Sequence, residues 1–271
     1  MSHDPKMSTE SRDPGAARLS SLSIRELLTL MNDGDARVPG AVAAAMPSIE
    51  RAVEAIVASI EGGGRLRYVG AGTSGRLGVL DASEWPPTFG VDGDLAAGII
   101  AGGEEALRRS IEGAEDDATA GETAIRAAAR GGDVVVGISA SGRAPYVVAA
   151  IAAAKALGAR TVGVTCDATA PLAAAVDIAV AVEVGPEIVA GSSRLKAGTA
   201  TKLVLNMLST AAMVRLGHTT NDLMTDLRAV NAKLKRRAIA IVASEAGVGE
   251  AEAVARLERT GWDIRRAVAG R

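Results

Sequence analysis

Two stretches of the sequence decide the fold: RLRYVGAGTSGR at residues 65–76 and DVVVGISASGR at residues 133–143. In each stretch, a short apolar run passes directly into a turn of glycine and hydroxyl residues, and a helical pattern follows. The consecutive valines Val134, Val135 and Val136 are typical of a strand that is covered on both faces. Such strands occur in parallel sheets, in which helices connect neighbouring strands.

The same alternation continues in both directions from these two stretches. It predicts five strands, over residues 65–70, 95–101, 133–139, 160–165 and 178–183. It predicts intervening helices over residues 74–83, 104–112, 116–130, 144–157 and 171–175. A final helix over 196–216 is apolar nearly all round, which indicates that it is buried. The expected fold class is therefore α/β, a doubly wound five-stranded parallel sheet with helices on both faces.

Helical patterns also precede this region. Ser23 is placed to cap a helix that runs to Met31, and a longer helix is expected over residues 38–60. Residues 1–18 are polar, so we expect them to form a mobile tail.

Three short helical patterns follow the helix expected over 196–216, and they predict a small C-terminal helical segment. They cover residues 232–243, 249–257 and 262–268. The expected organisation is a tail (1–18), a main domain with its N-terminal helices (19–228) and the short helical segment (229–271).

Composition and charge exclude several classes of function. The 271 residues carry 30 Lys and Arg against 32 Asp and Glu, and this balance argues against a nucleic-acid binder. Aromatic residues, at 2%, are too scarce for base-stacking platforms. A single cysteine, Cys166, fits a reducing compartment. No uncharged stretch approaches the roughly 20 residues of a membrane span, so we expect a cytoplasmic protein with no membrane partner.

The turns after the first and third strands carry groups suited to an anion. Thr73, Ser74 and Gly75 follow the first strand, and the third is followed by Ser139, Ser141 and Arg143. Hydroxyls and backbone N–H groups at a helix start favour a phosphate. The alternative is that each turn merely needs glycine and a capped helix start, but two matching turns are more specific than either one. Dinucleotide and Walker-type motifs do not occur in the sequence.

Two carboxylates and one lysine are further candidates. Glu84 precedes two prolines that fix the chain beyond it, and Glu115 lies in the acidic run 112–117. The alternatives are a solvated helix-end acid for Glu84 and a helix-start acid for Glu115. Lys196 lies in a polar helix entry, 191–199, which suits a phosphate or carboxylate, or ordinary capping. His3, His218 and Cys166 offer no zinc-ligand spacing, so we expect no metal.

Five stretches together resemble the N-acetylmuramic acid 6-phosphate etherase family, whose members have a sugar isomerase (SIS) domain. They are GAGTSGRLGVLDASEWPPTFG (70–90), EGAEDD (112–117), GISASGRAPYV (137–147), GPEIVAGSSRLKAGTATKLVLNMLST (185–210) and NDLMTDL (221–227). The resemblance covers roughly residues 22–242. It departs from the family at Trp85, where a smaller residue is more common, and at Ala144, where threonine is common.

The resemblance implies an activity. Family members cleave the D-lactyl ether of N-acetylmuramic acid 6-phosphate to N-acetylglucosamine 6-phosphate and D-lactate. The route is elimination followed by hydration, without metal or organic cofactor, in the recycling of cell-wall peptidoglycan sugar. Members are usually homodimers with the active site near the subunit interface.

The resemblance also implies roles for individual residues. Glu84 is expected to protonate the departing lactate and then to activate water, and Glu115 is expected to act as the second acid/base at C2. Two carboxyl groups with different pKa values can share such work. The sugar phosphate is expected to be held by the two hydroxyl-rich turns, with Arg143 and Lys196 binding the lactyl carboxylate or completing the phosphate site. The turn residues are Thr73, Ser74, Gly75, Ser139 and Ser141.

Two other functions fit the same fold. A phosphosugar isomerase would need only one carboxylate base, and a non-catalytic sugar-phosphate sensor would need neither glutamate. The pair of motifs around Glu84 and Glu115 favours the etherase.

Overall fold

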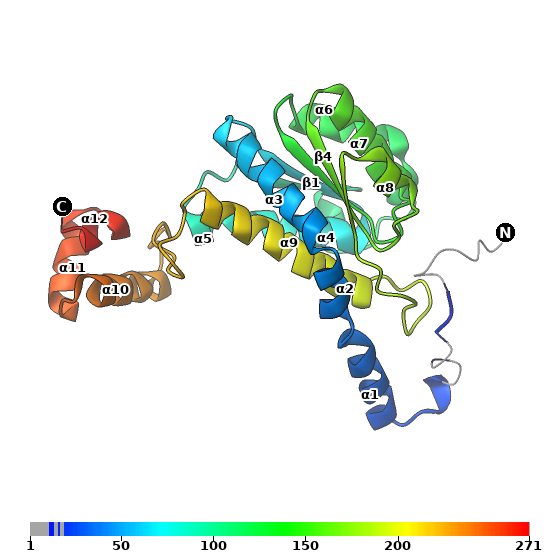
Figure 1. The fold of residues 1–271 in the computed structure, drawn as a ribbon, viewed down its shortest axis with the longest axis horizontal. Coiled ribbons are helices and arrows are strands. Elements are labelled where there is room, and N and C mark those ends of the chain that lie inside the picture. Colours follow the sequence, from blue (N-terminus) through cyan, green and yellow to red (C-terminus); the bar gives the residue numbers. More distant parts are fainter. Residues whose placement is uncertain (1–10, 14–15, 17–18, 271) are drawn as a thin grey trace.

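A computed structural model of the chain describes residues 11–13, 16 and 19–270 (Figure 1). Within them, five parallel strands form one sheet in the order β2-β1-β3-β4-β5. The strands are β1 (Leu66–Gly70), β2 (Ala96–Ile100), β3 (Val134–Ile138), β4 (Arg160–Thr165) and β5 (Ile178–Ala181). This confirms the predicted fold class. The tail expected over 1–18 lies mostly outside the described residues.

Strand β1 pairs with β2 on one side and with β3 on the other, so Gly70 is in register with both Ile100 and Ile138. The chain therefore leaves β1 toward one edge of the sheet and later returns to its other side. Doubly wound sheets bind ligands where the strand order reverses in this way, beyond the carboxyl ends of the strands.

Helices cover both faces of the sheet (Figure 1). One face packs against α2 (Val38–Ala44), α3 (Met46–Glu61), α4 (Gly72–Ser83) and α9 (Lys196–Arg215). The other packs against α6 (Ala118–Ala128), α7 (Pro145–Ala156) and α8 (Pro171–Ala175). Side chains alternate between the two cores, as a strand requires: Tyr68 lies in the first and Val69 in the second.

The N-terminal helices differ from the prediction. The helix expected over 38–60 is two helices, α2 and α3, which meet at Ala45. Pro47 lies in the first turn of α3, where its missing N–H is tolerated but where it cannot continue a helix from α2. Helix α1 (Ile24–Asp35) follows a 3-10 turn at Leu19–Ser21 and is capped by Ser23 as expected, with a capping box to Glu26, but it continues past Met31 to Asp35.

The segment between β2 and α6 is also less helical than predicted. Only the 3-10 turns Glu104–Leu107 and Ala114–Asp116 form there. The side chain of Arg76 donates to the carbonyl oxygens of Leu107 and Arg109, at 3.3 and 3.0 Å, so these two carbonyls bond to a side chain instead of to the backbone of a continuing α-helix. Conversely, a short helix that was not predicted, α5 (Trp85–Phe89), forms with the two prolines in its first turn.

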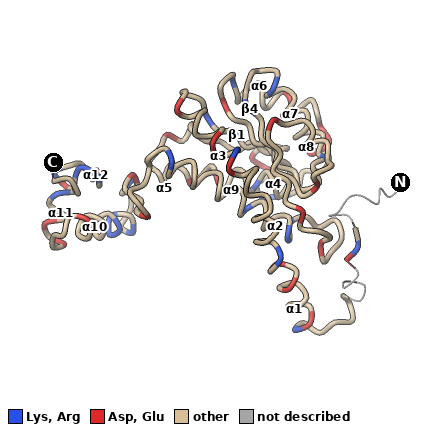
Figure 2. Tube along the Cα trace, viewed as in Figure 1, with Lys and Arg blue, Asp and Glu red and all other residues tan. Residues whose placement is uncertain are grey.

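The three C-terminal helices have a core of their own. They are α10 (Ala232–Ala246), α11 (Glu250–Arg259) and α12 (Ile264–Val268). Basic residues crowd the start of α10 (Figure 2), where the ammonium of Lys235 lies 4.9 Å from the ring centroid of Trp262. Asp226 joins this bundle to the main domain, because it pairs with Arg265 of α12 and lies 3.2 Å from Nδ1 of His218.

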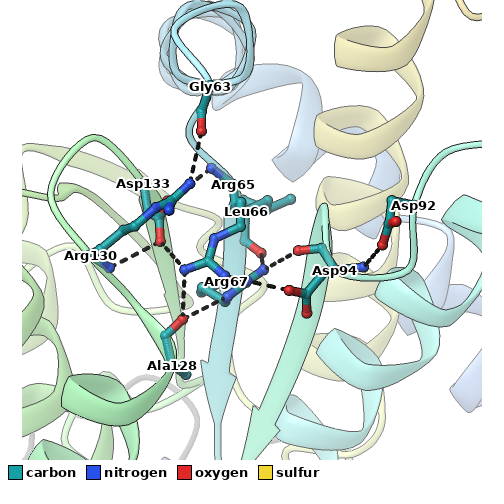
Figure 3. Close-up of polar contacts among 9 residues, drawn as sticks. All are labelled: Gly63, Arg65, Leu66, Arg67, Asp92, Asp94, Ala128, Arg130 and Asp133. Carbon is teal, nitrogen blue, oxygen red and sulfur yellow. Dashed lines mark hydrogen bonds and ion pairs between the residues drawn. The ribbon is translucent and has the colours of Figure 1, made fainter.

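A charged network closes the amino end of the sheet (Figure 3). The guanidinium of Arg67 is buried and donates to the carbonyl oxygens of Leu66, Asp94 and Ala128, at 2.9, 2.9 and 3.0 Å. Burial lowers the pKa of Arg67, and the nearby Arg65 lowers it further. Because these bonds tie three segments of backbone together, we assign the network a structural role.

Candidate functional site

The turn after β1 presents the start of α4 at the carboxyl edge of the sheet. Ala71, the N-cap residue, gives no side-chain cap, and the first-turn amides of Gly72, Thr73 and Ser74 have no acceptor earlier in the helix. The amide of Gly75 already donates to the carbonyl oxygen of Ala71 at 3.2 Å. The first three amides therefore offer an anion site, whereas Gly75 contributes close packing.

Gly75 has to be glycine for a steric reason. A methyl group there would lie 2.7 Å from the carbonyl oxygen of Gly70 and 2.6 Å from Cγ1 of Ile100. Helix α4 thus rests directly on β1 at the point where the strand ends.

The turn after β3 lies beside the first turn, because β1 and β3 are adjacent and in register. Ser139 is buried, and Oγ of Ser141 accepts from the amide of Arg143 at 3.3 Å. Gly142 adopts φ +64°, and a methyl group there would lie 2.4 Å from Cβ of Ala170. The structure therefore brings both hydroxyl-rich turns to the carboxyl ends of two adjacent strands.

Arg143 lies at this edge and forms an ion pair. One of its terminal nitrogens lies 3.2 Å from the carboxylate of Asp167. Burial acts to raise the pKa of Asp167, but hydrogen bonds from Thr169 and then from Arg143 hold it below its usual range. The cation is thus partly neutralised within the chain.

Lys196 begins α9 and is buried, with Nζ donating to the carbonyl oxygen of Val184 at 3.0 Å. The fully buried Glu187 accepts from the amides of Lys196 and Ala197, at 3.1 and 2.9 Å. The chain's own carboxylate therefore occupies the start of α9. Ordinary capping, one of the two interpretations of this segment, is present, and Glu187 is the residue responsible.

Glu115 also lies at the carboxyl edge. It is exposed in the 3-10 turn Ala114–Asp116, which packs against α7. Asp117 caps α6 by accepting from the amide of Ala120 at 2.8 Å. Because α6 leads back to the amino end of β3, its own start lies at the same edge as the two hydroxyl-rich turns.

Glu84 lies away from the carboxyl edge of the sheet, at the far end of α4. It directly follows α4, whose 12 residues, at about 1.5 Å each, separate it from the first turn by roughly 18 Å. This is longer than a hexose phosphate. The structure thus places Glu115 at the carboxyl ends of the strands and Glu84 of the same chain at their amino ends.

The exposed Glu84 lines a pocket of about 360 Å³ between α4, α5 and α9. Its lining residues are Leu80, Asp81, Glu84, Trp85, Thr88, Phe89, Lys202, Asn206, Ser209 and Thr210. Helix α9 was expected to be buried all round, but Lys202, Asn206 and Thr210 form an exposed stripe along it. That prediction was wrong because these polar residues recur every four positions and so share one face.

Asp81 forms the polar floor of this pocket. Its carboxylate accepts from the hydroxyls of Tyr68 and Ser209, at 2.8 and 3.0 Å, and from the indole of Trp85 at 3.3 Å. Burial raises the pKa of Asp81. Asp81 was not predicted from the sequence, although its spacing of three residues from Glu84 in the run DASE was a usable signal.

Comparison with known proteins identifies the family. Residues 48–155 match the model of the glucokinase regulatory protein N-terminal SIS domain, and residues 116–211 match the SIS domain model. An N-acetylmuramic acid 6-phosphate etherase from Symbiobacterium thermophilum is 50% identical, over 97% of this chain and 88% of its own. One from Gloeobacter violaceus is 53% identical, over 95% and 84%. The chain belongs to the N-acetylmuramic acid 6-phosphate etherase family.

The fold of this etherase-family chain also occurs in more distant proteins. Phosphoheptose isomerase from Neisseria gonorrhoeae superposes with a TM-score of 0.54 at 19% identity, over 70% of this chain and 98% of its own. This likeness supports the SIS fold alone.

Two further properties of the etherase-family chain concern metals and membranes. Among residues 11–13, 16 and 19–270, no three His, Cys, Asp or Glu side chains gather as a metal site would need. Within the same residues, the helices fall short of the length and apolarity needed to cross a membrane.

Cys166 follows β4, and its amide donates to the carbonyl oxygen of Ala140 at 2.9 Å. It is buried, and burial, followed by the charge of Glu187, raises the pKa of its thiol to about 12.

Proposed function

We propose that the protein cleaves the D-lactyl ether of N-acetylmuramic acid 6-phosphate with water, giving N-acetylglucosamine 6-phosphate and D-lactate. The observation that carries this proposal is the 50% identity, over 97% of the chain, to a protein named for this activity. The hydroxyl-rich turns and the two glutamates fit the chemistry. Consistent with this substrate, we place the protein in the cytoplasm, in the recycling of peptidoglycan sugar.

The turns after β1 and β3 hold the phosphate in this scheme. The first-turn amides of α4 and the hydroxyls of Thr73, Ser74, Ser139 and Ser141 supply donors at one edge of the sheet. Gly75 supports them by letting α4 approach β1. Arg143 and Lys196 add positive charge at that edge, through groups that are already bonded to Asp167 and Val184.

The elimination proceeds from the open-chain aldehyde, in which the proton on C2 is acidic. Glu115 takes that proton, and the C–H electrons form the C2–C3 double bond as the C3–oxygen bond breaks. Glu84 gives its proton to the departing lactate oxygen. Water then adds at C3 while Glu84 takes its proton, and Glu115 returns a proton to C2. This scheme needs no metal and no organic cofactor.

We propose further that each active site is shared between two copies of the chain. Because Glu84 lies roughly 18 Å from the first turn of its own α4, one chain cannot place both ends of the substrate at these groups. In a homodimer, Glu84 of one copy can meet the turns of the other. This arrangement supports the expectation of a homodimeric enzyme.

The test is lactate release from N-acetylmuramic acid 6-phosphate in water enriched in oxygen-18. Elimination and hydration place the label at C3 of the product sugar and leave the lactate unlabelled. Label in the lactate would overturn the two-glutamate scheme. Binding of the sugar phosphate without lactate release would instead indicate a sensor.

A further inference from the structure

We propose that Lys202 binds the carboxylate of the substrate's lactyl group, in the pocket that it shares with Glu84. The inference rests on the proposed function, because it assigns a residue to one end of that substrate. It adds a specificity-determining contact, since the lactyl carboxylate distinguishes the substrate from the product sugar phosphate.

The substrate carries two anionic groups, and the edge of the sheet accounts for only one. Two cations are expected at that edge. Arg143 pairs with Asp167, and Lys196 donates to the carbonyl oxygen of Val184. Both lie with the phosphate turns. In the shared site proposed above, the ether oxygen and its carboxylate lie near Glu84 of one copy, whereas these two cations belong to the phosphate turns of the other copy. We therefore look for the cation that binds the lactyl carboxylate on the copy that supplies Glu84.

Lys202 meets this requirement. Among the described residues that line the Glu84 pocket, it is the one with a permanent positive charge. Its ammonium donates to the side-chain oxygen of Asn206 at 2.9 Å, one helical turn further along α9. That partner is a neutral amide, so this bond directs the ammonium without neutralising it, while the charge of Lys202 also acts on the nearby carboxyl group of Asp81. An ammonium has three donors, so others remain for a carboxylate.

The contact also explains how the ether would be aligned. In the lactyl group, a single carbon separates the carboxylate from the ether oxygen. Fixing the carboxylate on Lys202 thus confines the ether oxygen to the neighbourhood of Glu84, the proposed proton donor. The same cation stabilises lactate as it departs.

The test compares two proteins on two substrates. Unaltered protein and Lys202→Met are assayed on N-acetylmuramic acid 6-phosphate and on the analogue whose lactyl carboxylate is a neutral carboxamide. We expect Lys202→Met to lower kcat/KM for the acid by about 10- to 100-fold, the range for a charge-assisted hydrogen bond. For the amide, the two proteins should differ by less than about threefold. Binding of N-acetylglucosamine 6-phosphate, which lacks the lactyl group, should not change.

Lys155→Met serves as the matched control, because it removes a partly exposed lysine from α7 on the other face of the sheet. It should leave kcat/KM unchanged for both substrates. An equal loss on the acid and the amide in Lys202→Met would overturn the Lys202 assignment while the proposed function stands. Absence of lactate release from the unaltered protein would overturn both.

Discussion

Glu84 and Asp81 are three residues apart at the end of α4, yet their surroundings differ. Asp81 is turned inward, where Tyr68, Trp85 and Ser209 donate to it. Glu84 is exposed at the pocket. One carboxylate thus fixes the last turn of α4 and the first residue of α5, and the other is left available for chemistry. We infer that Asp81 is a positioning residue for Glu84.

Replacing Glu84 should separate chemistry from binding. Glu84→Gln keeps the shape of the side chain but cannot exchange a proton, so kcat should fall by about 10²- to 10⁴-fold. Affinity for N-acetylglucosamine 6-phosphate, measured by calorimetry, should not change. Glu61→Gln, at the exposed end of α3, is the control and should retain full turnover. Loss of phosphate-ester binding in Glu84→Gln would show that Glu84 has a structural role instead.

Asp81 should make stability depend on pH in a direction opposite to that of most carboxylates. Its pKa is raised by burial, so the folded state favours the protonated form. The stability it contributes is therefore present below the unfolded pKa and is lost as pH rises through the folded pKa. The asparagine side chain in the variant Asp81→Asn cannot ionise. The free energy of unfolding of Asp81→Asn, minus that of the unaltered protein, should therefore be larger at pH 7.5 than at pH 4.5. Denaturant unfolding at the two pH values tests this, and a constant difference would contradict it.

At the scale of elements, the sheet could be predicted because its strands are short, apolar and covered on both faces. Strand β4 and helix α8 have the expected bounds. The helices were harder, since Pro47 ends one pattern and begins the next, and the prolines after Glu84 start α5 instead of a loop. The two hydroxyl-rich turns were identified from their residue types, and their adjacency became visible only with the strand order of the folded sheet. The separation of Glu84 from them follows from the length of α4, most of which the helix predicted over 74–83 already contained, but the motifs assigned both glutamates to one site without using that length.

The contact between α4 and β1 should not tolerate a side chain at Gly75. In Gly75→Ala, the added methyl meets the Gly70 carbonyl and Ile100, so we expect a loss of about 1–3 kcal/mol in the free energy of unfolding. Gly40→Ala is the matched control: Gly40 lies in α2, and a methyl group there has open space. That change should stabilise the protein by about 0.4–1 kcal/mol. Thermal and denaturant unfolding measure both, and an unchanged Gly75→Ala would contradict the packing.

At the scale of the whole molecule, a shared active site makes two defective chains complementary. Glu84→Gln and the double variant Ser139→Ala, Ser141→Ala should each be severely impaired alone. After mixing and exchange of subunits, half of the dimers are hybrids with one intact site each. Activity should return to about a quarter of that of the unaltered enzyme. Failure to recover activity despite proven exchange would place each site within one chain.

The buried Cys166 makes local opening at the carboxyl edge of the sheet measurable, because its rate of alkylation depends on how often that edge opens. Only a thiolate reacts with iodoacetamide, and a thiol that is 2% exposed with a pKa of about 12 reacts only when the edge opens. The Cys166 amide donates to the carbonyl oxygen of Ala140, which lies between Ser139 and Ser141 in the turn after β3. The alkylation rate at pH 8 should therefore report opening events at this edge, and it should slow when N-acetylglucosamine 6-phosphate is bound. A rate that does not depend on the sugar phosphate would mean that Cys166 becomes exposed without movement of the turns after β1 and β3.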